Sequence, residues 1–205
     1  PDILVLDEPT GELDPASSVQ IFELLKKLNE ASINVAYYKA AMSGNDRDSE
    51  GNLIPGDAVN VKTSSGISQD LNSMCPYMYE NAVSPHLAAK IERQEVDMDK
   101  VYSGFNSLTK DYDYVTMEGS GGILCPIRFG DQEVWLYDII ENLHLPVILI
   151  ADAGLGTINT VGLTTAFLKS RGIKLNGIEF GKSSAHYTFA RETKTIYKGL
   201  ASIKY

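Results

Sequence analysis

Several polar or glycine-rich segments of this chain combine carboxylates, a lysine and tight turns. Carboxylates are the hard oxygen ligands that Mg²⁺ prefers, and glycine-rich turns let backbone amides approach an anion. A lysine could form charge-assisted hydrogen bonds with the same anion. We therefore expect a site for a divalent cation and an anionic ligand, to which these segments contribute: Asp7 and Glu8, Lys39 with Ser43 and Gly44, Asp57, Glu118 to Gly122, and Asp152 with Gly154 to Thr157.

The elements that must position these residues alternate between strand and helix patterns. Short apolar runs predict strands at 3–6, 33–38, 114–117, 146–151 and 175–180. Capping residues and helical spacing predict helices at 14–28, 57–64, 84–93, 96–110, 134–143, 158–170 and 188–198, with a polar loop at 42–56. This alternation predicts one α/β domain over 1–205, a three-layer α/β/α sandwich with a mostly parallel central sheet. The carboxyl ends of parallel strands share one edge, where we expect the ligand to bind.

The composition excludes some classes of protein. The 205 residues carry 27 acids and 18 bases, a net charge of −9, whereas nucleic-acid binders present a basic face to phosphates. No apolar run reaches the ~18 residues that a membrane span needs. Cys75 and Cys125 lack metal-ligand spacing, which favours buried, reduced thiols and a cytoplasmic protein.

Five motifs occur in a characteristic order between residues 33 and 180. They are YYKAAMSG (37–44), IPGDA (54–58), AVSPHLAA (82–89), MEGSGG (117–122) and IADAGLGTIN (150–159). With these motifs the chain resembles the dethiobiotin synthetases. The resemblance implies a P-loop NTPase-like fold, a homodimer, and the substrates ATP with Mg²⁺, CO₂ and 7,8-diaminononanoate. The family forms a carbamate on the diamine, phosphorylates it with ATP, and closes the ureido ring.

The resemblance also implies roles for individual residues. Lys39 would contact the carbamate and phosphoryl group, and Ser43 would contact the substrate. Asp57 and Glu118 would help to hold Mg²⁺, and Asp7 is a further candidate ligand. The turn at the diamine would consist of Gly119, Ser120, Gly121 and Gly122. The dimer interface, near the neighbouring subunit's substrate, would contain Leu155, Gly156, Thr157, Ile158 and Asn159.

Both ends of the chain differ from the family pattern. The segment ILVLDEPTGELDP (3–15) resembles the Walker B strand and D-loop of an ABC-transporter ATPase, and that resemblance extends to about Leu28. The sequence contains no Gly-x-x-x-x-Gly-Lys-Ser/Thr phosphate loop. At the other end, GKSS (181–184) follows the last predicted strand where the family has an asparagine, and the tail 181–205 is short. The residues that bind the nucleotide are therefore not identified.

These departures favour an engineered or designed chimera, with a graft over 1–30 and a seam near Leu24–Ser32; an unusual natural homologue is the alternative. Four acids stand in place of the phosphate loop: Asp7, Glu8, Glu12 and Asp14. Their negative charges repel a triphosphate, so we expect ATP binding to be weak or absent. The favoured function is then a scaffold without turnover, which could retain a partial diamine or anion pocket. The alternative function is an active, ATP- and Mg²⁺-dependent dethiobiotin synthetase.

The acids near Lys39 leave two interpretations open. They could bind a divalent cation without nucleotide, or Asp7 and Glu8 could be solvated or paired with Lys39. The histidines have no partner spacing, which favours a structural role for His86 and surface positions for His144 and His186.

Overall fold

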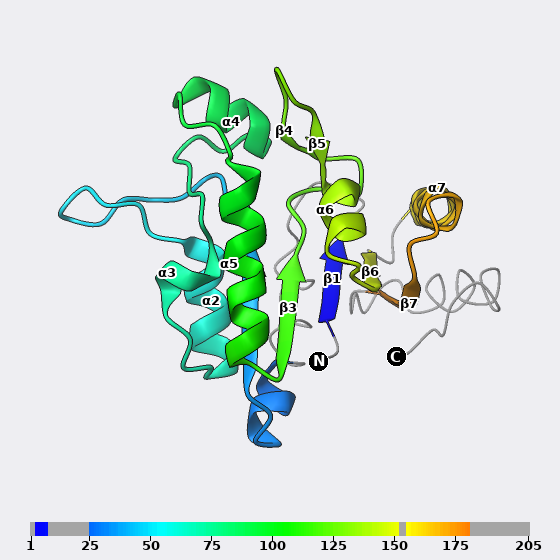
Figure 1. The fold of residues 1–205 in the computed structure, drawn as a ribbon, viewed down its shortest axis with the longest axis horizontal. Helices are drawn as coiled ribbons and strands as arrows, with labels where there is room; N and C mark the ends of the chain where they lie inside the picture. The colour runs from blue at the N-terminus through cyan, green and yellow to red at the C-terminus, as the bar shows by residue number, and fades with distance from the viewer. Residues whose placement is uncertain (1–2, 8–24, 152–154, 181–205) are drawn as a thin grey trace.

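The computed structural model describes residues 3–7, 25–151 and 155–180 (Figure 1). Several predicted features lie outside these residues: the part of the helix predicted at 14–28 that precedes Leu25, the helix at 188–198, the GKSS segment and His186. Glu8, Glu12, Asp152 and Gly154 also lie outside them.

Five parallel strands form the central sheet, in the order β2-β3-β1-β6-β7 (Figure 1). The predicted parallel sheet is thus confirmed over the described residues. The strand β1 runs between β3 and β6, so the chain crosses from one half of the sheet to the other around it. Open parallel sheets bind ligands at such a crossing point, beyond the carboxyl ends of the strands. The strands are β1 (Ile3–Asp7), β2 (Val35–Lys39), β3 (Tyr114–Glu118), β6 (Val147–Ala151) and β7 (Leu175–Phe180).

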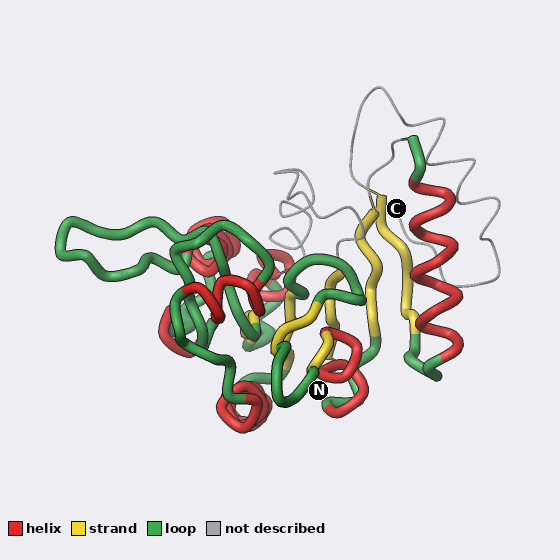
Figure 2. Tube along the Cα trace, turned by 90° about the horizontal axis from the view of Figure 1, so that it is seen from above, coloured by secondary structure: helices red, strands yellow, loops and turns green. Residues whose placement is uncertain are grey.

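Helices cover the sheet on both faces, as Figure 2 shows from above. Alternate residues of β2 enter different cores, because successive side chains of a strand point to opposite faces. Tyr38 packs with Phe105 and Ile139 in one core, and Tyr37 packs with Ala58 and Val61 in the other. Residues 25–30 are helical. The other helices are α2 (Gly56–Ser65), α3 (Leu71–Met74), α4 (Pro85–Ile91), α5 (Met98–Asp111), α6 (Leu136–Asn142) and α7 (Thr157–Ser170).

The structure corrects the helix predicted at 134–143. Val134 and Trp135 form the strand β5 (Val134–Trp135), which pairs with β4 (Pro126–Arg128), and α6 begins only at Leu136. The Trp135 amide donates to the Asp138 carboxylate at 2.8 Å, a capping contact that sets this helix start. The helix predicted from 96 begins at Met98, because the Asp97 carboxylate accepts the Asp99 amide.

Cys75 is buried, as predicted, whereas Cys125 is half-buried, contrary to prediction. His86 packs against the ring of Phe129, and His144 is exposed, as predicted. Among the described helices, none is long and apolar enough to cross a membrane.

Candidate functional site

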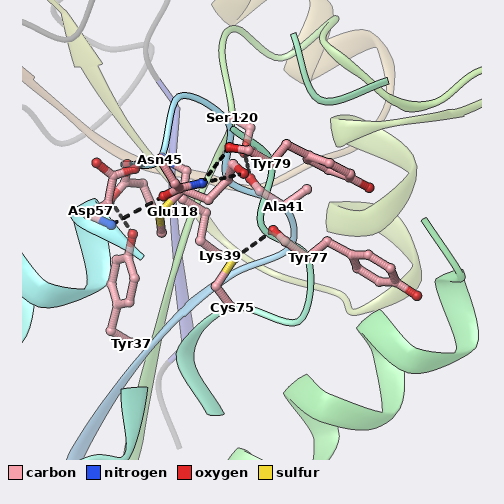
Figure 3. Close-up of polar contacts among 12 residues, drawn as sticks. Tyr37, Lys39, Ala41, Asn45, Asp57, Cys75, Tyr77, Tyr79, Glu118 and Ser120 are labelled. Atoms are coloured by element: carbon pink, nitrogen blue, oxygen red, sulfur yellow. Dashed lines mark hydrogen bonds and ion pairs between the residues drawn. The ribbon is translucent and has the colours of Figure 1, made fainter. Parts of the chain in front are cut away.

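The site is centred on Lys39, the last residue of β2. Parallel pairing sets Lys39 beside Glu118, the last residue of β3. The Lys39 Nζ atom lies 2.7 Å from Glu118 Oε1 and 2.7 Å from Asp57 Oδ2, as Figure 3 shows. Asp57 lies in the first turn of α2. Residues from three distant segments thus meet in one ion-paired cluster.

Lys39 and Glu118 are both buried, so their charges interact strongly. Lys39 is 5% exposed and Glu118 is 8% exposed. Burial by itself lowers the pKa of Lys39, but the charges and hydrogen bonds of Glu118 and Asp57 outweigh it, so the pKa is raised above its ordinary value. Lys39 is therefore a cation at neutral pH, held between two acids. Such an ammonium can exchange one carboxylate partner for an oxygen of an anionic substrate.

Tyr37 completes the cluster from below. Its side chain projects from the same face of β2 as Lys39, two residues away, and its hydroxyl donates to Glu118 Oε2 at 2.8 Å (Figure 3). Burial, together with the nearby charge of Glu118, raises the pKa of Tyr37 well above its ordinary value. The hydroxyl therefore remains a hydrogen-bond donor at neutral pH.

The loop after β2 carries Ser43 and is anchored by Asn45. The Asn45 side chain donates to the carbonyl oxygens of Met42 and Tyr79, both at 2.9 Å, and accepts the Gly56 amide at 3.3 Å. Asn45 thus ties the Ser43 loop to the first residue of α2, next to Asp57. Ser43 itself is half-buried in this loop.

The glycine-rich turn Gly119–Gly122 follows β3 directly and is tied back to the β2 loop. The Ser120 hydroxyl donates to the Ala41 carbonyl oxygen at 2.6 Å (Figure 3). Gly121 has a φ of +82°, and a Cβ atom there would lie 3.3 Å from the Cys125 side chain. Two strand ends that both carry predicted site residues are thereby joined.

The segment Leu155–Asn159 lies elsewhere along the same edge. It follows β6, on the opposite side of β1 from β3, and leads into α7. The Leu155 side chain is fully exposed and Asn159 is exposed, whereas Thr157 is buried. The structure therefore does not gather these residues with Lys39 in the way that it gathers Asp57 and Glu118.

Two of the three predicted metal ligands are brought together. Asp57 and Glu118 both contact Lys39, whereas only the backbone of Asp7 is described, one residue beyond the register partner of Glu118. The described residues contain no cluster of three or more acids, histidines or cysteines with metal-binding geometry. A pair of carboxylates is nevertheless sufficient for Mg²⁺ when a nucleotide supplies further oxygen ligands.

Sequence reasoning missed three residues that support the site: Tyr37, Asn45 and Gln69. Gln69 lies 32 positions from Tyr37 in the chain but hydrogen-bonds its backbone. The alternation along β2 could have placed Tyr37 beside Lys39, because both belong to one face of the strand. No local pattern indicates that Asn45 contacts Tyr79 or that Gln69 contacts Tyr37, because these partners are distant in the chain.

The fold and this site together define a P-loop NTPase-like α/β protein. Residues 18–197 match the family model of an AAA domain. A ParA family ATPase from Chlorobium tepidum has a similar fold, with a TM-score of 0.58 at 12% identity over 98% of this chain and 82% of that one. The cell division protein MinD of Aquifex aeolicus gives a TM-score of 0.53 at 11% identity, over 99% and 80% of the two chains.

Relatives with higher sequence identity identify the family within this fold class. An ATP-dependent dethiobiotin synthetase of Clostridium botulinum (strain Loch Maree) is 48% identical over 156 residues, covering 76% of this chain and 68% of the relative. One from Clostridium perfringens (strain ATCC 13124) is 40% identical over 180 residues, covering 88% and 78%. The chain belongs to the dethiobiotin synthetase family.

These findings overturn the favoured prediction of a chimeric or designed scaffold without turnover. The family match runs from residue 18 to 197, across the seam expected near Leu24–Ser32, and nothing in the comparisons supports an ABC-transporter segment. The comparisons do not support the expectation of weak or absent ATP binding either, since the relatives are ATP-dependent enzymes. The alternative prediction, an active enzyme of this family, is the one that the comparisons support.

Proposed function

We propose that this chain is an ATP-dependent dethiobiotin synthetase, which converts 7,8-diaminononanoate and CO₂ into dethiobiotin. The observation that carries the proposal is the buried Lys39 ammonium, held at 2.7 Å by both Asp57 and Glu118. All three lie at positions of the family motifs. The identity of 40–48% to dethiobiotin synthetases supports the same reaction.

The chemistry requires stabilisation of negative charge at two stages. One substrate amine adds to CO₂ and loses a proton to form a carbamate, and a carbamate oxygen then attacks the γ-phosphorus of ATP, breaking its bond to the bridging oxygen so that ADP leaves. The second amine attacks the carbonyl carbon of the mixed anhydride, the ureido ring closes, and phosphate leaves. Lys39 would donate to the carbamate and phosphoryl oxygens, since preorganised cations are most effective where charge develops in a water-poor site.

Asp57 and Glu118 fit a magnesium ion by the chemistry of their donors. Each is a carboxylate at the carboxyl edge of the sheet, and the Asp57 side chain is 27% exposed, so a hydrated ion has access to it. When bound, Mg²⁺ would supply positive charge to the phosphates of ATP. Ion pairing with Lys39 holds both carboxylates in place and balances their charge before substrates bind.

The substrate side of the site would be formed by the loops that follow β2 and β3. Ser43 and the Gly119–Gly122 turn belong to adjacent strand ends, which the contact from Ser120 to Ala41 links. We further propose a homodimer in which Leu155–Asn159 faces the neighbouring subunit, because Leu155 is a fully exposed leucine at this edge. The sequence holds no phosphate-loop motif, so no motif assigns residues to the ATP phosphates.

Mass spectrometry of the product tests the proposal. The purified chain is incubated with 7,8-diaminononanoate, bicarbonate, ATP and Mg²⁺, and we expect dethiobiotin and ADP in equal amounts. Omitting ATP or adding EDTA should abolish both products. A preparation of the correct mass and fold that forms no dethiobiotin at millimolar ATP would contradict the proposal.

A further inference from the structure

The Glu118 carboxylate has a different partner on each oxygen. Its Oε1 atom lies 2.7 Å from Lys39 Nζ, and its Oε2 atom accepts the Tyr37 hydroxyl at 2.8 Å. Tyr37 is completely buried, so water does not compete for this hydroxyl. The terminal torsion of a glutamate is broad, and a donor on each oxygen restricts it. Tyr37 therefore determines which way the carboxylate plane faces.

The position of Tyr37 is in turn secured by Gln69. The strand β2 is an outer strand of the described sheet, so one side of its backbone has no neighbouring strand there. Gln69 Oε1 accepts the Tyr37 amide at 2.8 Å, and Gln69 Nε2 donates to the Tyr37 carbonyl oxygen at 3.0 Å. The Gln69 side-chain amide thus makes the backbone hydrogen bonds that a neighbouring strand would otherwise make. With 1% exposure, Gln69 makes these bonds in a dry environment.

We propose that Tyr37, clamped by Gln69, is a positioning residue that orients Glu118 toward Lys39 and thereby holds the Lys39 ammonium in its reactive place. The inference rests on the proposed function, because it concerns the efficiency of that reaction. Tyr37 acts through Glu118, since its hydroxyl contacts one carboxylate oxygen and Lys39 contacts the other.

The chain offers a matched control at the next position. The Tyr38 hydroxyl is also buried and also donates at 2.8 Å, but its acceptor is the Val101 carbonyl oxygen in α5, on the opposite face of the sheet. Tyr37→Phe and Tyr38→Phe each remove one buried hydroxyl and one hydrogen bond of equal length. Both variants should lower the melting temperature by about 2–4 °C.

Steady-state kinetics separates positioning from general loosening. In Tyr37→Phe we expect kcat to fall about tenfold, with the KM values for ATP and the diamine within twofold of wild type, because outer partners of functional ligands contribute effects of this size. Tyr38→Phe should keep kcat within twofold. If Tyr37→Phe retains the wild-type kcat, or if both variants lose activity equally, the inference is overturned.

A double-mutant cycle in thermal stability provides a readout that does not depend on turnover. The melting-temperature shifts of Tyr37→Phe and Glu118→Gln should combine to clearly less than their sum, whereas those of Tyr38→Phe and Glu118→Gln should add. Additive shifts for both pairs would contradict the inference. If the cycle shows coupling but the wild type forms no dethiobiotin, the proposed function is refuted. Tyr37 then remains the residue that holds Glu118.

Discussion

Lys39 and Glu118 are neighbours across the last paired position of β2 and β3, although 79 residues separate them in the chain. Parallel pairing ends both strands at the same level, so the ammonium and the carboxylate emerge together at the sheet edge. The first turn of α2 then adds Asp57 on the open side. A charged cluster is thereby built from rigid elements rather than from mobile loops alone.

Removing the cation should affect both turnover and folding. We expect Lys39→Ala to lower kcat at least about 100-fold, the scale seen when one preorganised charge donor is lost. It should also reduce the free energy of unfolding by about 3 kcal/mol, since Glu118 would stay buried without its cation. Denaturant titration measures the second effect. The exposed Lys90 is the control, and Lys90→Ala should change the free energy of unfolding by less than about 0.5 kcal/mol.

Stability should decline in alkaline solution. Burial raises the pKa of Cys75 from 9.0 to about 12, and burial together with the charge of Glu118 raises the pKa of Tyr37. The pKa of Lys39 is also raised, because burial, which lowers it, is outweighed by the charges and hydrogen bonds of Glu118 and Asp57. Groups with raised values keep their proton longer in the folded state, so their stabilisation is complete below the unfolded values and is lost as pH rises through the folded ones. We expect a constant urea midpoint up to about pH 8 and a falling one above about pH 9. A midpoint that rises between pH 9 and 11 would contradict these directions.

Gly104 should be required only while Tyr38 carries its hydroxyl. A Cβ atom on Gly104 would lie 2.9 Å from the Tyr38 hydroxyl oxygen, but no closer than 3.5 Å to the ring. Gly104→Ala should therefore destabilise the wild type by about 1–2 kcal/mol. In the Tyr38→Phe background the same change should stabilise by up to about 1 kcal/mol, because alanine favours helix α5 over glycine. Thermal unfolding of the four proteins measures this change of sign.

The glycine-rich turn Gly119–Gly122 should depend on Gly121 more than the turn at Gly51 depends on that glycine. Both glycines have a left-handed φ, of +82° and +87°, but only at Gly121 would a Cβ atom meet a neighbour, the side chain of Cys125. Gly121→Ala should cost about 2 kcal/mol of stability and raise the KM for the diamine. Gly51→Ala should cost about 1 kcal/mol, with an unchanged KM. If the two variants change the KM for the diamine equally, the Gly119–Gly122 turn is not part of the diamine site.

Much of the site could be predicted because its residues follow recognisable strand ends. The apolar run before Lys39 and the run before Glu118 are short and bounded by polar residues, a local pattern that indicates buried parallel strands. Knowing that parallel strands share an edge then brings Lys39 and Glu118 together, and Asp57 opens a helix close behind the loop that follows β2. The start of α6 was harder to predict, because the pairing of β5 with β4 overrides the helical pattern of Val134 and Trp135.

The sequence by itself determined the strand-and-helix alternation, the family motifs, and the charges placed at the ends of β2 and β3. Only the tertiary structure decided how those charges are partnered. The contacts from Tyr37 to Glu118, from Gln69 to the backbone of Tyr37, and from Asn45 to Tyr79 join residues far apart in the chain. Such hydrogen bonds depend on distance and direction after packing, and side-chain spacing along the sequence contains neither.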